Sequence, residues 1–244
     1  MKTKILHEDA SIFVIHKPAG IAVQSARVGQ MDCESELRNY LARKGESPYL
    51  GLVHRLDQPV EGVLVVARTK DVAAKLNKQL AADTLNKNYL AVVHLKAGEV
   101  PDTAVFKDYM VKDGQMARII GSDSQTGQFP DSSQRCAVAY DKNAKKAILK
   151  YQILQKSNDL NIALVDIQIE TGRFHQIRCQ MSYHGMPLLG DVKYGSSVSV
   201  ELSRELGIRQ TALCANRIAF KHPVTGKLME FEVSPENVAF AKFL

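Results

Sequence analysis

The fold is decided by residues 61–93, whose sequence is EGVLVVARTKDVAAKLNKQLAADTLNKNYLAVV. Residues 63–67 (VLVVA) are apolar and rich in β-branched side chains, which predicts a buried strand. Thr69 supplies helix-start chemistry for the segment that follows. The apolar face of this predicted helix comprises Val72, Leu76 and Leu80. Residues 89–93 (YLAVV) predict the next strand, so the stretch forms a strand–helix–strand unit.

Further strands are predicted on both sides of this unit. Residues 12–15 (IFVI) form a short apolar run before it. Residues 147–154 and 160–169 are long β-rich segments after it, and the Ser-Asn-Asp segment between them is typical of a hairpin turn. A last hairpin joins residues 213–220 to residues 228–233 through a Pro-Val-Thr-Gly turn.

Two more helices are predicted from apolar residues at helical spacing. The apolar face of the first comprises Leu37, Tyr40 and Leu41. That of the second comprises Phe174, Ile177 and Met181, with Gly185 as the stop. Between Lys96 and Lys146 the polar composition predicts short strands and loops. Strands dominate over helices, so we expect one α+β domain over residues 1–244 with a largely antiparallel mixed sheet.

The composition is that of a globular protein: of 244 residues, 45% are hydrophobic and 24% charged, which excludes a disordered or fibrous chain. No apolar run approaches the ~18–20 residues of a membrane helix, and no signal peptide is visible, so we expect a soluble, cytoplasmic protein. The four cysteines are too scattered for zinc spacing or a disulfide framework. The net charge of +6 is a moderate excess that favours a polyanionic partner.

His54, Arg55 and Asp57 lie within one short segment, just before the predicted buried strand. A carboxylate at such a junction, beside cationic side chains, stays ionised at the end of the sheet. This placement suits a nucleophile or a base at the mouth of a cleft. The same residues also fit a surface ion pair between Arg55 and Asp57, with His54 capping a turn.

Residues 173–178 (RFHQIR) form a second polar cluster at the end of a strong strand. We expect them to occupy about one and a half turns of a helix, with polar groups on both flanks. A helix N-terminus with guanidinium groups from Arg173 and Arg178 suits the binding of phosphate or carboxylate. The alternative is a charged helix in which the hydrogen bonds of His175 are satisfied within the protein.

No cofactor chemistry is indicated by the sequence. Neither His54 nor His175 belongs to a close pattern of His, Cys and acidic residues, so no metal site is predicted. The sequence also lacks a Walker-type phosphate loop, a dinucleotide glycine fingerprint and a serine nucleophile elbow. An enzyme built from this chain would therefore work with side chains alone.

A series of short motifs follows one order along the chain: residues 17–20 (KPAG), 51–57 (GLVHRLD), Tyr89, 170–178 (ETGRFHQIR), 185–191 (GMPLLGD), 194–195 (YG) and 213–215 (LCA). In sequence and order these motifs resemble the RluA family of pseudouridine synthases. The resemblance runs from about residue 5 to about residue 235, and it favours the functional interpretation of both polar clusters. It implies the pseudouridine synthase fold, a mixed sheet flanked by helices and loops with a central active-site cleft.

The resemblance implies that Asp57 is the essential carboxylate, which acts on the sugar or the base of a uridine as a nucleophile or by deprotonation. Arg178 is expected to pair with Asp57 and to keep it ionised. Tyr89 is expected to stack on the uracil and to assist proton transfer. The reaction is an isomerisation without redox change or group donor, which agrees with the absence of cofactor motifs.

The target uridine is expected to leave its stack, and Arg55, beside Asp57, is the side chain predicted to fill the gap. Arg173 and His175 are expected to bind the RNA backbone, together with the lysines of the predicted helix after Thr69. The full set of predicted RNA- and uracil-binding residues is His54, Arg55, Arg173, His175, Gln176, Ile177 and Leu213, of which the last two line the base pocket.

Four positions depart from the family pattern. Val60 and Glu61 replace two hydroxyl-bearing residues after the aspartate, and only the glycine that follows them is kept. Phe174 stands where threonine or serine is usual, and Gln180 where a histidine is frequent. Because the three predicted catalytic residues are retained, we interpret these departures as variation within a subgroup.

RNA is the predicted partner, and a monomer is expected. Because the first motif is already at Lys17, we expect no N-terminal RNA-binding domain of the kind that members often carry. This resembles stand-alone members such as the TruC-like branch, so tRNA or large-subunit ribosomal RNA is the expected substrate, with tRNA favoured. Two other functions are compatible with the residues: a non-catalytic RNA-binding module or chaperone on the same fold, and an unrelated carboxylate hydrolase without RNA affinity.

Overall fold

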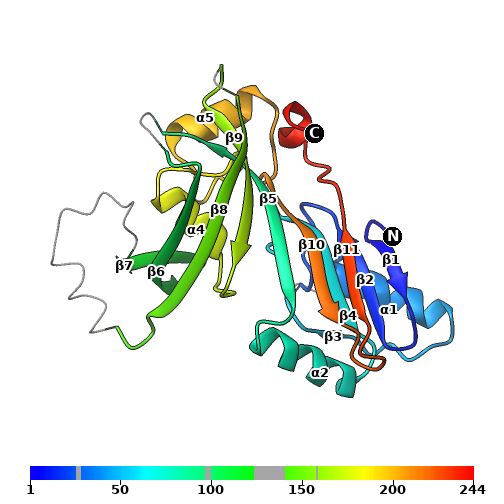
Figure 1. Ribbon diagram of the computed structural model, residues 1–244. Coiled ribbons are helices and arrows are strands. Elements are labelled where there is room, and N and C mark those ends of the chain that lie inside the picture. Colours follow the sequence, from blue (N-terminus) through cyan, green and yellow to red (C-terminus); the bar gives the residue numbers. More distant parts are fainter. Residues whose placement is uncertain (26–28, 97–99, 124–140, 158) are drawn as a thin grey trace. The chain divides into compact units, whose positions relative to one another are not determined.

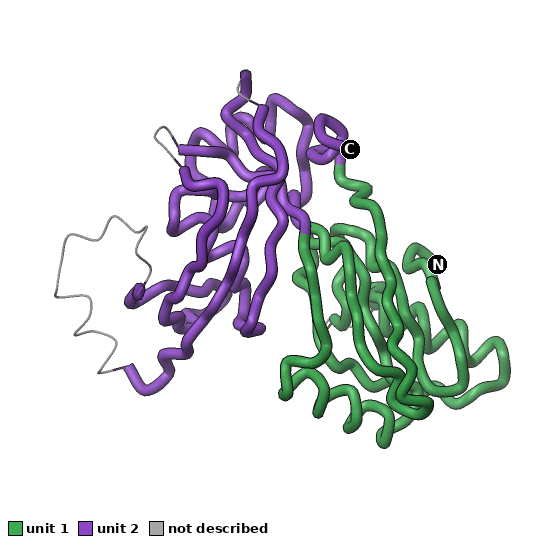
Figure 2. The backbone as a smooth tube through the Cα atoms, in the orientation of Figure 1, with its two compact units in different colours: residues 1–89, 214–237 green, residues 90–213, 238–244 purple. Residues whose placement is uncertain are grey.

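The computed structural model describes residues 1–25, 29–96, 100–123, 141–157 and 159–244. The chain forms two compact units, one of residues 1–89 and 214–237 (unit 1) and one of residues 90–213 and 238–244 (unit 2; Figure 2). The predicted α+β class is confirmed, whereas the single-domain assignment and the central cleft stay predictions. Among the described residues, no helix is long and apolar enough to cross a bilayer.

Unit 1 is built on a mixed sheet (Figure 1). Its strands are β1 (Lys4–Glu8), β2 (Ile12–Lys17), β3 (Gly51–Leu52), β4 (Glu61–Ala67), the first part of β5 (Asn86–His94), β10 (Leu213–Lys221) and β11 (Leu228–Glu232). The order is β1-β2-β4-β10-β5, with β3 paired to β4 and β11 paired to β10. Strand β4 pairs antiparallel with β2 and parallel with β10, which makes the sheet mixed.

The predicted strand–helix–strand unit is confirmed as β4, α2 (Lys70–Ala81) and β5. The Thr69 hydroxyl accepts a hydrogen bond from the backbone N–H of Val72 at 3.3 Å, as an N-cap residue does. Val72 and Leu76 are buried in one apolar cluster with side chains of β4 and β10. Burial of each such side chain contributes about 1.5–3 kcal/mol, so helix α2 is held by its apolar face. Helix α1 (Cys33–Arg43) confirms the other N-terminal helix.

Gly62 of β4 lies against Ala215 of β10, where the two strands pair in parallel. Its φ is +136°, and a Cβ there would lie 2.5 Å from the backbone N and O of Ala215. We expect Gly62→Ala to lower the free energy of unfolding by about 2–4 kcal/mol in urea denaturation, because both the dihedral and the contact resist a side chain. The control Gly114→Ala combines a φ of +56° with open space. Equal losses for the two variants would show that the close approach is unimportant.

Unit 2 contains the rest of β5 and a second run of strands (Figure 1). These are β6 (Thr103–Asp113), β7 (Met116–Ser122), β8 (Lys145–Ser157) and β9 (Ile162–Ile169), in the order β5-β9-β8-β6-β7. The helices are α4 (Gln176–Tyr183), α5 (Ser197–Glu205) and the short η1 (Val238–Lys242). The segment between Lys96 and Lys146, for which short strands and loops were predicted, therefore contains the two regular strands β6 and β7. Residues 97–99 and 124–140 of this segment lie outside the described residues.

The predicted helix over the second polar cluster begins later than expected. His175 adopts a left-handed conformation with a φ of +52°, and α4 starts only at Gln176. Ile177 and Met181 are buried as expected, but Phe174 is 40% exposed and does not belong to their apolar face. The left-handed conformation of His175 prevents a helix from passing through residues 173–178, because a left-handed residue cannot be part of a right-handed helix. The expectation that residues 173–178 form continuous helical turns is therefore wrong.

Candidate active site

Asp57 lies in the loop between β3 and β4 of unit 1, and this loop is held by backbone hydrogen bonds. The N–H of Val60 donates to the carbonyl oxygen of Asp57 at 3.1 Å, which closes a turn. The N–H of Gly20 donates to the carbonyl oxygen of Gln58 at 2.8 Å. Residue Asp57 itself is half-buried, and its neighbour Arg55 is exposed. The first motif thus positions the loop that carries the predicted catalytic carboxylate.

Lys17 is a fully buried cation beneath this loop. Its Nζ donates to the carbonyl oxygens of Pro18, Ile21 and Gln58 at 3.0, 2.7 and 3.2 Å. Burial lowers the pKa of Lys17 to about 8, against the opposing effect of the nearby Asp57 and Glu61 carboxylates. The ammonium group therefore stays largely protonated near neutral pH. Lys17 belongs to the motif at 17–20, and the only sign of its role in the sequence is a cation next to an apolar strand.

Tyr89 stands in β5, and the structure brings it close to Asp57 within unit 1. Its side chain is buried. Burial raises the pKa of the phenol, and the Asp57 carboxylate raises it further. The phenol is therefore protonated at physiological pH, so it is suited to donate a hydrogen bond or a proton and unsuited to act as a base. This pair of one carboxylate and one protonated phenol is the chemically equipped part of unit 1.

His54, predicted as an RNA ligand, also forms a hydrogen bond within unit 1. Its Nε2 lies 3.4 Å from the backbone N of Val65 in β4 and accepts that hydrogen bond. Burial lowers the pKa of the imidazole to about 3, and the positive charge of Lys87 adds to this effect. The ring is therefore neutral at physiological pH. Its RNA contact stays a prediction.

The neutral state of His54 predicts a stability that falls in acid. Because the folded-state pKa is about 3 and the unfolded-state value about 6.5, the unfolded chain binds the proton first between these values. In this pH range, His54 therefore lowers the free energy of unfolding by up to about 1.4 kcal/mol for each unit that the pH falls. We expect His54→Gln, which stays neutral, to have a shallower acid profile in urea denaturation between pH 6.5 and 4.

The comparison of the two profiles isolates His54 from the carboxylates, which titrate in both proteins. His7→Gln is the matched control, because His7 is a half-buried histidine of the same unit beside the carboxylate of Asp9. Its substitution is expected not to remove the acid sensitivity that His54 causes. If His54→Gln left the profile unchanged, the imidazole would be protonated in the folded state.

Glu61 shows what one departure from the family pattern does. Its buried carboxylate accepts backbone N–H groups of Glu236 and Asn237, both at 3.0 Å. Burial raises the pKa of Glu61, while these two hydrogen bonds and Lys17 oppose the rise. The side chain therefore ties the C-terminal end of unit 1 to β4, a role that a serine or threonine is too short to fill in the same way.

Arg178 of unit 2 is buried and forms a two-pronged ion pair with Asp191. Its Nε lies 2.7 Å from Oδ2, and its Nη2 lies 2.8 Å from Oδ1. Asp191 is buried as well, and its Oδ1 also accepts the N–H groups of Lys193 and Tyr194. Two parallel charge-assisted bonds orient the guanidinium plane. The predicted Asp57–Arg178 pair, whose members belong to different units, stays a prediction.

Asp191, the buried partner of Arg178, was not among the predicted site residues. It is the last residue of the motif at 185–191, and a buried arginine requires a nearby carboxylate. The guanidinium of Arg178 also lies 5.2 Å from the centre of the Tyr194 ring. The Tyr194 hydroxyl in turn lies 2.8 Å from Nδ1 of His175 and accepts the N–H of Ala117 at 2.6 Å. His175, Arg178, Asp191 and Tyr194, which belong to three of the motifs, therefore form one connected polar network.

The other predicted RNA ligands of unit 2 differ in accessibility. Gln176 is buried, with its Oε1 bound by Thr171 and Arg173 and its Nε2 donating to the carbonyl oxygen of Ile148, which favours a structural role. Ile177 and Leu213 are buried too. Arg173 is exposed, and its Nε donates to the carbonyl oxygen of Lys146. Their RNA contacts stay predictions.

Gln180 of α4, another departure from the family pattern, belongs to a buried polar cluster. Its Nε2 donates to Oδ2 of Asp108 at 2.6 Å. Nε2 of His184 lies 3.0 Å from the same oxygen. The imidazole stacks on Phe106 with ring centres 3.7 Å apart. This departure from the family pattern thus satisfies a buried carboxylate of β6.

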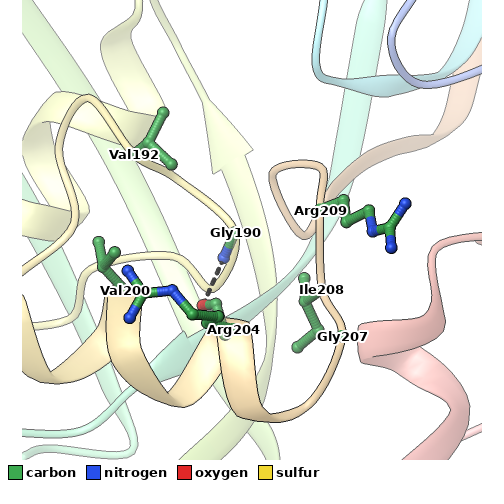
Figure 3. A pocket seen from close by; sticks show the side chains of 8 residues that line it. Gly190, Val192, Val200, Arg204, Gly207, Ile208 and Arg209 are labelled. Carbon is green, nitrogen blue, oxygen red and sulfur yellow. Dashed lines mark hydrogen bonds between the residues drawn. The ribbon is translucent and has the colours of Figure 1, made fainter.

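A cavity of about 400 Å³ lies beside helix α5 (Figure 3). Val200 and Arg204 of the helix line it, together with Val192 and the segment that contains Ile208. The Oγ of Ser203 accepts the N–H of Gly190 at 2.8 Å at this place. The Arg204 guanidinium is paired with Glu201 on the same helix. The lining is mostly apolar and carries no arrangement of polar groups that would define a reaction.

The described residues hold no group of three or more His, Cys, Asp or Glu side chains arranged for a metal ion. The absence of a metal and of a cofactor stays a prediction. The side chains of both units can take part in proton transfer and electrostatic stabilisation. Unit 1 supplies the Asp57 carboxylate near the protonated phenol of Tyr89, and unit 2 supplies Arg178, which Asp191 holds in place.

Comparison with known proteins places this chain among RNA-modifying enzymes. The family described as RNA pseudouridylate synthase matches residues 11–183. Ribosomal large subunit pseudouridine synthase D of Zymomonas mobilis is 31% identical over 237 residues, which are 94% of this chain and 68% of that protein. An uncharacterized RNA pseudouridine synthase of Bacillus subtilis is 31% identical over 248 residues, covering 98% and 71%. The solved human RNA pseudouridylate synthase domain containing 4 is 25% identical, with a TM-score of 0.76 and coverage of 98% and 92%.

Proposed function

The chain belongs to the RNA pseudouridylate synthase family, and we propose that it converts specific uridines of large-subunit ribosomal RNA to pseudouridine with Asp57 as the catalytic carboxylate. The observation that carries this proposal is that Asp57 and Tyr89 lie near enough within unit 1 for the carboxylate to raise the pKa of the buried phenol. The reaction breaks the bond between ribose C1′ and uracil N1, rotates the base and joins C1′ to C5. The proton of C5 is lost and N1 becomes protonated, so the reaction is balanced without a cofactor.

Asp57 acts on the sugar or on the base in this proposal, and Tyr89 supports it. The phenol stacks on the uracil and, being protonated, serves as a hydrogen-bond or proton donor. The uridine leaves its stack to reach the half-buried carboxylate. Arg55 is exposed two residues before Asp57, which fits its proposed role of filling the vacated position with a planar guanidinium.

The choice of RNA rests on the relatives. The Zymomonas mobilis relative is named for the ribosomal large subunit. We therefore propose ribosomal RNA in place of tRNA, which the resemblance to stand-alone members had favoured. The excess of basic residues supports binding of either polyanion. The cytoplasmic location and the monomeric state stay predictions.

The test is tritium release from RNA labelled at C5 of uridine. Unmodified large-subunit ribosomal RNA and unmodified tRNA are incubated side by side with the wild-type protein and with Asp57→Asn. We expect release from the ribosomal RNA with the wild-type protein only. Release from tRNA alone would correct the substrate. No release from either RNA, despite salt-sensitive binding, would favour the alternative of a non-catalytic RNA-binding module.

A further inference from the structure

Phe174 is an aromatic side chain in an unusual position for its type. It is 40% exposed, and of the aromatic residues that the structure describes it alone is exposed. Its position immediately precedes the left-handed residue His175, which lifts it away from the buried face of α4. The exposed face of an aromatic ring gains nothing for folding, so an exposed ring next to polar side chains suggests a binding function.

The ring is held in place from one side. Its centre lies 3.7 Å from that of His175, and the two planes are inclined by 22°. His175 is itself oriented by the hydrogen bond of its Nδ1 with the Tyr194 hydroxyl at 2.8 Å, and that hydroxyl also accepts the N–H of Ala117. Phe174 is therefore a rigid surface, which loses little conformational entropy when a planar group stacks on it.

Basic side chains lie near the ring. The Nζ of Lys112 in β6 lies 5.0 Å from the ring centre, in a cation–π contact. Lys112, Lys145 and Arg173 line a cavity of about 340 Å³ beside Phe174. None of the residues that line this cavity is acidic. Gly172 leaves the space open, since a Cβ built there would have no atom within 4 Å.

This combination of a fixed aromatic plane, a cavity and three cations matches the chemistry of a nucleotide in an unpaired RNA strand. Nucleobases stack on aromatic side chains in most modes of single-strand recognition, while Lys and Arg neutralise the phosphates. The cavity volume lies within the range of small-molecule sites. A stacking base would take the place of the Lys112 ammonium over the ring, and the flexible lysine would be available for a phosphate.

We infer that Phe174, with Lys112, Lys145 and Arg173, forms a binding site for an unpaired nucleobase of the RNA other than the reacting uridine. The inference rests on the proposed function, because it takes RNA as the substrate. It assigns a role to the phenylalanine that replaces a hydroxyl-bearing residue of the family pattern. All four residues of the site belong to unit 2.

The test uses the fact that the protein contains no tryptophan. Phe174→Trp introduces a single fluorophore at the site, in the full chain and in the Asp57→Asn background. A single-stranded oligouridylate of about 12 nucleotides is titrated against it. We expect quenching of the tryptophan by the stacked base. The same titration with inorganic polyphosphate, which carries the charge without bases, is expected to leave the fluorescence unchanged.

Val224→Trp is the matched control, since Val224 is 61% exposed in a turn of unit 1 and does not line the cavity beside Phe174. Its tryptophan is expected not to respond to the oligouridylate. Equal quenching at positions 174 and 224, or equal quenching by polyphosphate, would overturn the inference, because the signal would then not report stacking at this site.

A binding measurement complements the fluorescence. Phe174→Leu keeps an apolar side chain but removes the ring, and we expect it to weaken oligouridylate binding about 5- to 150-fold, whereas Phe174→Tyr retains binding. Unchanged affinity in Phe174→Leu would contradict the inference even if wild-type protein released tritium. Conversely, stacking at Phe174 without tritium release from any RNA would support this site and overturn the proposed function.

Discussion

Asp57→Asn is expected to abolish tritium release while leaving RNA binding intact. The amide has the shape of the carboxylate but can neither attack the sugar nor accept a proton, so the rate should fall by at least about 10²-fold. The fold of the loop should persist, because the Val60 and Gly20 hydrogen bonds use backbone atoms of the loop and not the carboxylate. We expect a loss of rate without a loss of stability.

The measurement is the initial rate of release at saturating RNA, with the dissociation constant for RNA determined in parallel. Asp71→Asn is the matched control, because Asp71 is an exposed carboxylate of the same unit that pairs with Lys75 on helix α2. It should retain the wild-type rate. Wild-type release by Asp57→Asn would contradict the assignment of the catalytic carboxylate and would direct attention to another acid.

Asp191→Asn is expected to cost about 3–5 kcal/mol in the free energy of unfolding. The substitution leaves the guanidinium of Arg178 buried without its negative partner, and a buried unpaired charge is much more costly than a lost surface ion pair. It also weakens the acceptor for the N–H groups of Lys193 and Tyr194. Because Arg178 is predicted to act in catalysis, activity should fall as well.

Urea denaturation, followed by circular dichroism, measures this effect. The control Glu201→Gln removes the partner of Arg204 on the exposed face of α5, where the expected loss is within about 1 kcal/mol. A loss for Asp191→Asn as small as that of Glu201→Gln would mean that solvent or another group compensates Arg178, and the ion pair would then not be a structural requirement of unit 2.

Local patterns in the sequence predicted much of the fold correctly. The apolar run that became β4, the cap at Thr69 and the helical spacing of α2 are all decided by neighbouring residues. The hairpin between β10 and β11 was predicted in the same way, from two apolar segments around a turn. These features need no information from distant parts of the chain, and the motifs that indicate the family are equally local.

Contacts between distant residues could not be predicted in this way. Glu61 accepts the backbone N–H groups of Glu236 and Asn237, and nothing in the sequence around position 61 indicates that partner. The fully buried Lys17 satisfies its ammonium group with carbonyl oxygens from two loops. In each case only the tertiary fold brings the partner near, because a buried carboxylate needs hydrogen-bond donors and a buried ammonium group needs acceptors.

The late start of α4 has a similar cause. Periodicity in RFHQIRCQM favours a helix from the first arginine, yet His175 turns left-handed, and its Nδ1 lies within hydrogen-bond distance of the Tyr194 hydroxyl. A single residue in the left-handed region is compatible with the local sequence only when tertiary contacts hold it there. The exposure of Phe174, and with it the proposed nucleobase site, follows from this one turn.

The sequence by itself determined the strand–helix–strand unit of β4, α2 and β5, the hairpin of β10 and β11, the α+β class and the family, because these depend on local periodicity and on short motifs. The tertiary structure decided which side chains meet: Arg178 with Asp191, Asp57 with Tyr89, and Phe174 with its basic surroundings. The physical reason is that hydrogen bonds, ion pairs and burial act over a few ångströms in space, whereas the residues that share them lie far apart along the chain.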